Sequence, residues 1–170
     1  MHRRQLLKVG LFAGALLTVA GGAAWWLVNT QARSGDRFQP ATRNLFLVVG
    51  SAVLAGSLPE AESARHQALQ AWLAGLEITV AGMPFAVQNE LDEMVLILLN
   101  PLGRVGLAGL RQPWESASTA QVQEAMQGLR LSTVAVRQQI FHALRDLCNA
   151  AYFAAPQSWA ALGYPGPLKV

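Results

Sequence analysis

The stretch AESARHQALQAWLAGLEITV, residues 61–80, decides the fold class. Its apolar side chains recur at spacings of three and four residues, which is the period of an amphipathic helix. The sequence Gly82-Met83-Pro84 ends the pattern, because glycine and proline are poor helix formers. We therefore expect a long helix that packs on one face, formed by Ala61, Ala64, Ala68, Leu69, Trp72, Leu73, Leu76 and Val80.

The segment before this helix also carries helix signals. Asn44–Leu54 is apolar without interruption and predicts a first buried helix. Ser57, followed three residues later by Glu60, matches the pattern of a capping box at the start of the long helix. Residues 33–43 are polar and contain a glycine and a proline, so we expect a linker there and a helical domain over 44–170.

The segment after the long helix is expected to form one more helix and then a loop. Asn89 with Asp92 and Glu93 predicts a helix start, because acidic groups in a first turn complement the helix dipole. The Asn100-Pro101 pair ends that helix. Residues 101–113 contain three glycines and two prolines, which favour a loop or a frayed turn.

Two further helices complete the expected fold. Ser118 or Thr119 begins a short helix that ends near Gly128, and Ser132–Ala155 is the last long helix. No useful length of sequence alternates with a period of two, so no strand is predicted. The body is expected to be all-α, with about five helices preceded by an N-terminal signal or anchor helix. The stripe of the last helix is Ile140, Phe141, Leu144, Leu147, Cys148 and Ala151.

The N-terminus reads His2-Arg3-Arg4-Gln5-Leu6-Leu7-Lys8 and is followed by an apolar run, Val9–Val28. Paired arginines before a weakly hydrophobic, glycine-rich run are typical of a twin-arginine export signal. Leu6 stands where that pattern usually has phenylalanine. The targeting residues are then Arg3, Arg4, Leu6, Leu7 and Lys8.

A signal anchor that stays in the membrane is the alternative for residues 1–32. The run Val9–Val28 is about the length that spans a bilayer, whereas its four glycines are typical of a signal. Thr30-Gln31-Ala32 is a tolerable but indistinct cleavage site. In both cases the positive charges stay cytoplasmic, and we expect the rest of the chain in the periplasm, at the cytoplasmic membrane.

The charge of the chain is concentrated in this leader. The whole chain has 13 Lys and Arg against 10 Asp and Glu, and Arg3, Arg4 and Lys8 account for the excess. The remaining arginines are scattered singly, which excludes a basic nucleic-acid surface. Charged residues make up only 14% of the chain, against about a quarter in typical domains. A surface buried against a permanent partner explains this scarcity, and an unusually neutral exterior is the alternative.

No catalytic or metal-binding pattern stands out in the sequence. Cys148 is the single cysteine, so no internal disulfide is expected, and it is either buried or bridged to another chain. Its place on an apolar stripe favours burial. His66 and His142 lack a ligand partner at suitable spacing. Gly103-x-x-Gly106-x-x-Gly109 differs from the dinucleotide fingerprint. We expect no cofactor, metal or active site in this chain.

The C-terminus YFAAPQSWAALGYPGP, residues 152–167, is rich in aromatic side chains and ends in a rigid turn. Such a segment either folds back on its own helix or presses aromatic groups into a partner, since Trp and Tyr provide large buried areas and a polar handle. The candidate partner-binding residues are Tyr152, Trp159, Gly163, Tyr164, Pro165 and Gly166.

The chain resembles the gluconate 2-dehydrogenase subunit 3 family, the small subunits of membrane-bound, FAD-dependent dehydrogenases of the glucose–methanol–choline type. The leader and the tail carry the resemblance motif by motif, and an all-helical body with Met83-Pro84-Phe85 agrees with it. It implies a non-catalytic small subunit that binds, stabilises and escorts a large subunit through the twin-arginine translocase. FAD then belongs to that large subunit, which oxidises a sugar, a sugar acid or an alcohol.

In many such complexes a cytochrome c subunit passes the electrons on to quinone. The escort role is physically sensible, because FAD is loaded in the cytoplasm and the twin-arginine route carries folded cargo. Two other classes stay open. One is a stand-alone, membrane-anchored helical structural protein of the cell envelope, and the other is a small exported enzyme or binding protein that uses His66 or His142.

Overall fold

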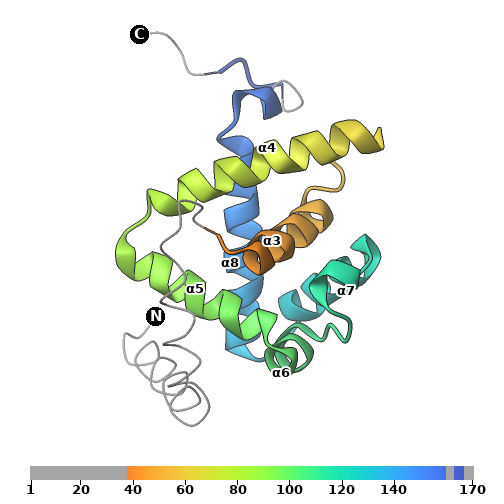
Figure 1. The fold of residues 1–170 in the computed structure, drawn as a ribbon, viewed down its shortest axis with the longest axis vertical. Helices are drawn as coiled ribbons and strands as arrows, with labels where there is room; N and C mark the ends of the chain where they lie inside the picture. Colours follow the sequence, from red (N-terminus) through yellow and green to blue (C-terminus); the bar gives the residue numbers. More distant parts are fainter. Residues whose placement is uncertain (1–37, 160–162, 167–170) are drawn as a thin grey trace. The chain divides into compact units, whose positions relative to one another are not determined.

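The computed structural model describes residues 38–159 and 163–166, and these residues form an all-α domain without a strand (Figure 1). The all-α prediction is confirmed for this part. The expected signal or anchor helix, with Arg3, Arg4, Leu6, Leu7 and Lys8, lies outside the described residues. The long helices are α3 (Pro40–Val53), α4 (Glu62–Ala81), α5 (Phe85–Leu99), α7 (Thr119–Arg130) and α8 (Ala135–Phe153), and α6 (Pro101–Gly103) is one short turn.

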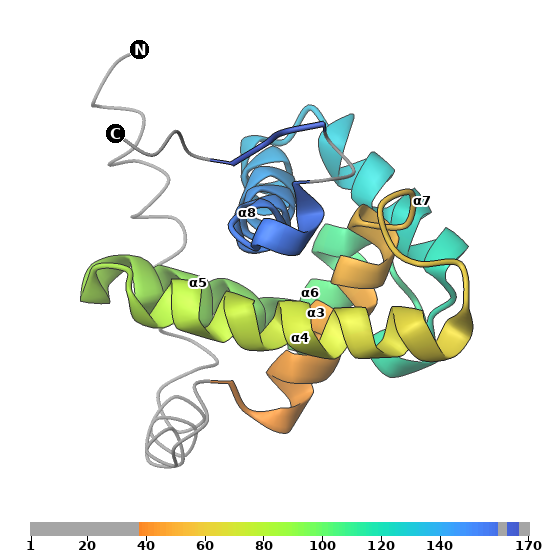
Figure 2. The ribbon, with the colours of Figure 1, turned by 90° about the horizontal axis from the view of Figure 1, so that it is seen from above.

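Helix α3 is the centre of the domain. It packs against α4, α5, α7 and α8, and the views of Figures 1 and 2 agree that it lies among them. Gly50 of α3 makes the closest approach, because a Cβ at this position would lie 2.4 Å from the ring of Trp72 on α4. A glycine is therefore required where these two helices cross. Arg43 of α3 and Glu77 of α4 add an ion pair between the same two helices.

The domain begins earlier than the expected boundary at residue 44. Phe38 is buried and stacks on Phe46, with ring centroids 5.0 Å apart. Pro40 is the first residue of α3, a position that needs no backbone N–H donor. The polar segment 38–43 that suggested a linker is therefore part of the packed domain.

Helix α4 ends as predicted and begins differently. Gly82 caps its C-terminus, and the stripe residues Trp72, Leu73, Leu76 and Val80 are buried. The predicted capping box of Ser57 and Glu60 is wrong, since α4 begins at Glu62 with no side-chain cap. Instead, the turn before α4 is held by Arg65, which donates to the carbonyls of Pro59 and Glu60.

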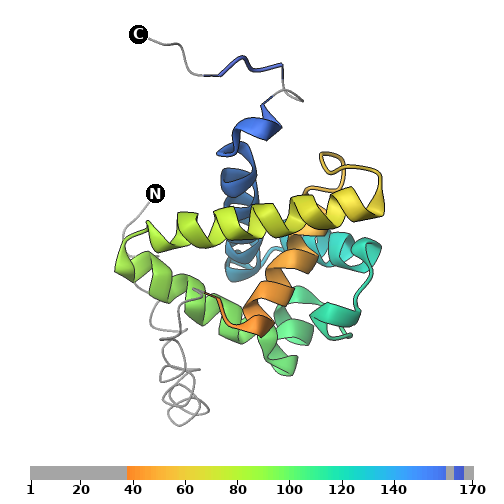
Figure 3. The same ribbon diagram turned by 45° about the horizontal axis from the view of Figure 1, so that its top comes forward.

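Helix α5 begins at Phe85, before the expected start at Asn89. Asn89, Asp92 and Glu93 therefore lie inside the helix, and the interpretation of the acids as first-turn charges is wrong. Pro84 explains the earlier start, because it occupies the N-cap position and its carbonyl accepts from Val87 and Gln88. The predicted end is confirmed at Leu99. Figure 3 shows α4 and α5 meeting at a corner with α3 between them.

Much of the expected loop at residues 101–113 is helical. Asn100 caps α6 by accepting from the N–H of Leu102 at 2.9 Å, and a π-helix, η1 (Arg104–Ala108), continues the chain. Gly103 permits this path, since a Cβ there would lie 2.0 Å from the carbonyl oxygen of Ile97. Gly109 ends η1 in the left-handed region at φ 74°. The glycines that suggested a loop therefore allow a short helical path with a π-helical turn.

Helices α7 and α8 follow the sequence pattern closely. Ser118 and Gln121 form a reciprocal capping box at the start of α7. Helix α8 begins at Ala135 and ends at Phe153, inside the expected range of 132–155. Its stripe faces α4 and α7, with Leu147 partly buried and the other five members buried. In the described ranges, no helix has the length and apolar character needed to cross a membrane.

Candidate functional site

The described residues of the C-terminal tail, up to 159 and 163–166, form an aromatic cluster beyond the end of α8. Ala155 is extended, as expected before a proline, and Pro156 opens the short 3-10 helix η3 (Pro156–Ser158). Ser158 is buried and its hydroxyl donates to the carbonyl of Ala155 at 2.8 Å. These contacts turn the chain back, so that Trp159 lies against the end of α8.

Trp159 is the central residue of this cluster. Its indole N–H donates to the carbonyl of Phe153 at 2.8 Å, a group left without a helical partner at the end of α8. Tyr164 makes two contacts with Trp159. The Tyr164 amide donates to the Trp159 carbonyl at 3.0 Å, and the two rings meet edge to face with centroids 5.4 Å apart. The predicted partner-binding residues Trp159 and Tyr164 therefore lie together.

The glycines of the tail shape its turn. Gly163 and Gly166 have φ values of 66° and 97°, a region that other residues rarely adopt. A Cβ at Gly166 would also lie 3.2 Å from Cζ3 of Trp159. Gly166 therefore lies close to the indole, and a side chain at this position would require the ring to shift by a few tenths of an ångström.

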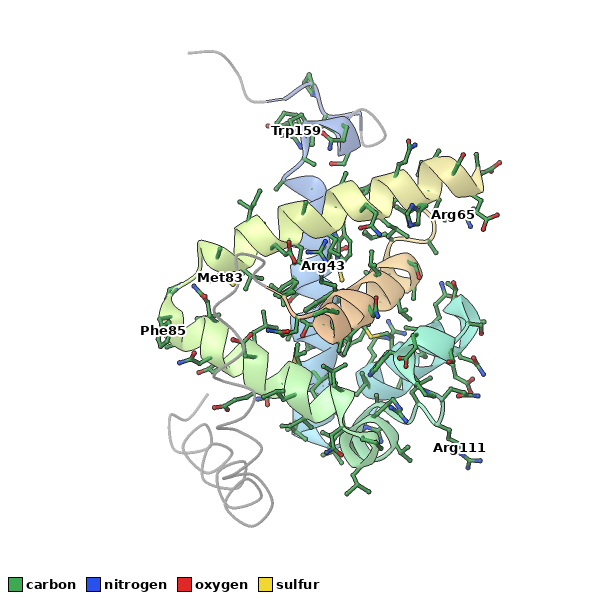
Figure 4. The ribbon with its side chains drawn as sticks, in the orientation of Figure 1. Arg43, Arg65, Met83, Phe85, Arg111 and Trp159 are labelled. Carbon is green, nitrogen blue, oxygen red and sulfur yellow. The ribbon has the colours of Figure 1, made fainter. Side chains whose placement is uncertain are left out.

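The aromatic groups of the tail differ in exposure. Tyr164 is 49% exposed and Phe153 is 39% exposed, Pro165 is exposed, and Trp159 is half-buried. In Figure 4, Trp159 lies beyond the end of α8. The cluster thus presents an aromatic surface to its surroundings while the indole N–H is already paired within the domain.

Tyr152 has a different environment from the other candidate residues. Its hydroxyl donates to the carbonyl of Ser57 at 2.7 Å, which ties the end of α8 to the turn between α3 and α4. Its ring meets Phe153 edge to face at 5.2 Å. The Tyr152 hydroxyl, expected from the sequence to bind a partner, therefore makes its hydrogen bond inside the domain.

Cys148 lies in the core, as its position on the stripe of α8 predicts. It is fully buried, and burial raises the pKa of its thiol to about 12. The indole N–H of Trp72 donates to the Cys148 carbonyl at 3.1 Å and fixes this part of α8 against α4. A bridge from this thiol to another chain, the alternative drawn from the sequence, would require α8 to open.

Comparisons with protein-family models, curated proteins and solved structures gave no match.

The histidines and acids weighed in the sequence do not converge. His66 lies on α4 and His142 on α8, and both are exposed. Within residues 38–159 and 163–166, no group of three His, Cys, Asp or Glu side chains could hold a metal ion. His66 lines a shallow surface depression with Glu62, Ser63 and Gln67 at the start of α4.

A second apolar surface lies at the corner between α4 and α5. Ile78 is 74% exposed, Phe85 is 76% exposed and Val87 is 43% exposed. The sequence patterns predict no binding role for these residues. A signal was present, because no charged residue occurs between Glu77 and Glu90, and a run of this kind at an exposed helix corner is unusual.

Proposed function

We propose that this protein is a non-catalytic small subunit of an exported dehydrogenase complex. It binds, stabilises and escorts an FAD-dependent large subunit that oxidises a sugar, a sugar acid or an alcohol. The twin-arginine translocase carries the pair, and a cytochrome c subunit is a further candidate partner. FAD belongs to the large subunit.

The observation that supports this function most is the aromatic cluster of the tail. Trp159 is held by the Phe153 carbonyl and by Gly166, so it forms a rigid base for Tyr164. A pre-ordered aromatic surface binds at a smaller entropic cost than a mobile one. Half of the Tyr164 side chain is still exposed and available to a partner.

The leader supports the escort part of the proposal. Arg3 and Arg4 match the arginine pair of a twin-arginine signal, and a large subunit without its own signal would cross the membrane by binding this chain. Replacing both arginines with lysine is expected to leave this chain and its partner in the cytoplasm. Normal export of the pair in that variant would contradict the escort role.

The deciding experiment is purification of the tagged full-length chain from native membranes, followed by an absorbance spectrum. We expect a larger companion protein with a flavin spectrum, and a haem band if a cytochrome subunit is present. Tyr164→Ala should lower the recovery of the companion. Leu131→Ala is the matched control, since Leu131 is 67% exposed and is the C-cap of α7, just before α8 begins at Ala135. Tyr164 follows the opposite end of α8, a helix roughly 27 Å long.

A stand-alone structural protein of the cell envelope is the second candidate. It is favoured by the contacts that close the tail on its own domain, namely Trp159 with the Phe153 carbonyl and Tyr152 with the Ser57 carbonyl. In this case the chain is recovered alone and without a flavin spectrum. Recovery of Tyr164→Ala would then equal that of the wild type.

A further inference from the structure

The corner between α4 and α5 is an apolar projection of the domain. Figure 4 shows Met83 and Phe85 at the outer end of the two helices, with Phe85 pointing away from the body. About three quarters of the side chains of Ile78 and Phe85 are exposed, and Val87 adds to the same surface. A soluble domain rarely exposes large apolar side chains together unless they contact something.

The corner is also free of charge. Residues 78–89 contain no Asp, Glu, Lys or Arg. The acid just before them, Glu77, is turned toward α3, where it pairs with Arg43 and is only 16% exposed. An apolar medium could therefore receive the corner without the desolvation of a charged group.

Three carbonyls of the corner, those of Ala81, Met83 and Pro84, are paired within the chain. The side-chain amide of Gln88 donates to the carbonyls of Met83 at 2.8 Å and Ala81 at 3.3 Å. The amides of Gly82 and Met83 donate to Ile78 and Val80. These bonds matter because an unpaired carbonyl is costly in an apolar medium. Pairing of these carbonyls lowers the cost of moving the turn into an apolar medium.

We propose that the α4–α5 corner, residues Ile78, Gly82–Phe85 and Val87, inserts into the interface of a lipid bilayer. The inference rests on the exported, membrane-side location that the proposed function and the leader imply, and it does not depend on the partner. The apolar run Val9–Val28 ends about ten residues before Phe38, and an extended chain of that length reaches at most about 35 Å. A retained anchor would keep Phe38, at the start of the domain, within that distance of the bilayer.

The charges near the corner specify the kind of lipid surface. Glu90 and Glu93 are exposed on the next turns of α5, and no lysine or arginine occurs between Arg65 and Arg104. Attraction to anionic headgroups needs basic residues beside the apolar ones. Insertion is therefore expected to be driven by apolar contacts and not by attraction between charges. It should occur in zwitterionic lipid and depend little on salt concentration.

The test uses the full chain reconstituted in phosphatidylcholine vesicles that contain brominated lipid. An environment-sensitive fluorophore is attached to Ala86→Cys at the corner, or to Ala120→Cys as the control. Both alanines are exposed second residues of their helices, α5 and α7. The buried Cys148 thiol stays unlabelled in the folded protein.

We expect the brominated lipid to quench the label at position 86 at least about twofold more than the label at position 120. Adding Ile78→Asp and Phe85→Asp should remove the difference. Leu131→Asp, at an equally exposed site on another surface, should leave it unchanged. Equal quenching at both positions in the unmodified corner would overturn the proposal.

Recovery of the flavoprotein separates this inference from the proposed function. Phe85→Asp should leave recovery of the companion protein from native membranes unchanged. Loss of the companion in this variant, or shielding of the label at position 86 only when a companion protein is present, assigns the corner to a protein pocket and overturns insertion into lipid. Quenching at position 86 with no flavoprotein recovered from wild type would leave the inference standing and the proposed function without support.

Discussion

Two tryptophans make the same pair of contacts in two regions of very different exposure. Trp72 donates to the Cys148 carbonyl of α8 and packs against Gly50. Trp159 donates to the Phe153 carbonyl of α8 and packs against Gly166. Trp72 is 6% exposed in the core, whereas Trp159 is half-buried at the surface. The same local geometry therefore holds the core together in one region and builds an exposed aromatic surface in the other.

The largest expected difference is in stability. Trp72→Ala should lower the free energy of unfolding by about 3–5 kcal/mol, because it leaves a cavity between α3, α4 and α8. Trp159→Ala should cost much less, since most of the tail lies outside the core. Unfolding of the full chain in detergent, followed by far-UV circular dichroism, measures both. Equal losses of unfolding free energy in the two variants would mean that the tail is part of the core.

The glycine partners of the tryptophans allow a finer test. Gly50→Ala should cost about 1–3 kcal/mol, because the added methyl overlaps the Trp72 ring in a packed interior. Gly75→Ala on α4 is the matched control. A Cβ there meets nothing within 4 Å, and alanine is a better helix former than glycine by roughly 0.5–1 kcal/mol. In the same unfolding assay, we expect Gly50→Ala to lower the free energy of unfolding and Gly75→Ala to raise it.

The core region should also respond to alkaline pH through Cys148. Its pKa in the folded state is raised from 9.0 to about 12 by burial, so the unfolded chain loses the thiol proton first. The contribution to stability is therefore complete below pH 9 and falls by about 1.4 kcal/mol per pH unit above it. The measurement is the difference between wild type and Cys148→Ala at pH 8 to 10. If the unfolding free energies of wild type and Cys148→Ala changed in parallel over this pH range, the thiol would be accessible to solvent.

The smallest expected effect is local to the tail. Tyr164→Ala removes the ring that meets Trp159, a contact worth about 0.5–1.5 kcal/mol. Amide hydrogen exchange of the segment after Trp159 should then be about 2- to 10-fold faster, whereas exchange in α8 should not change. Leu131→Ala is the control and should alter neither. Faster exchange throughout α8 would show that the tail supports the whole helix.

The sequence predicted the helices from their apolar stripes and was less successful at their beginnings. The stripe of α8 and the second half of the α4 stripe, from Trp72 on, lead to buried residues, because periodicity reports which face is covered. In the first half of the α4 stripe, Ala61 is exposed and Ala64 and Ala68 are only partly buried. The start of α5 lies before the expected one, since Asn89, Asp92 and Glu93 look like a first turn. Local hydrogen bonds of Pro84 and Gln88 set the true start. The π-helix was missed because Gly103 reads as a loop residue until its contact with Ile97 is known.

The candidate site was only partly accessible to sequence reasoning. The cluster of Trp159, Tyr164 and Gly166 follows from aromatic and glycine composition. The inward hydrogen bond of Tyr152 joins residues far apart in the chain, and composition carries no information about it. The exposure of Ile78 and Phe85 was likewise hidden, because an apolar residue near a helix end is usually buried. The function, the partner and the targeting residues stay predictions.

The hydrogen bonds from Tyr152 to Ser57 and from Trp72 to Cys148 have a consequence for biosynthesis. They connect α8 to elements 95 and 76 residues earlier, so α3 and α4 lack a large part of their cover until α8 has left the ribosome. Native packing is thereby delayed until residue 153 has emerged. During that delay the apolar faces of α3 and α4 are open to chaperones.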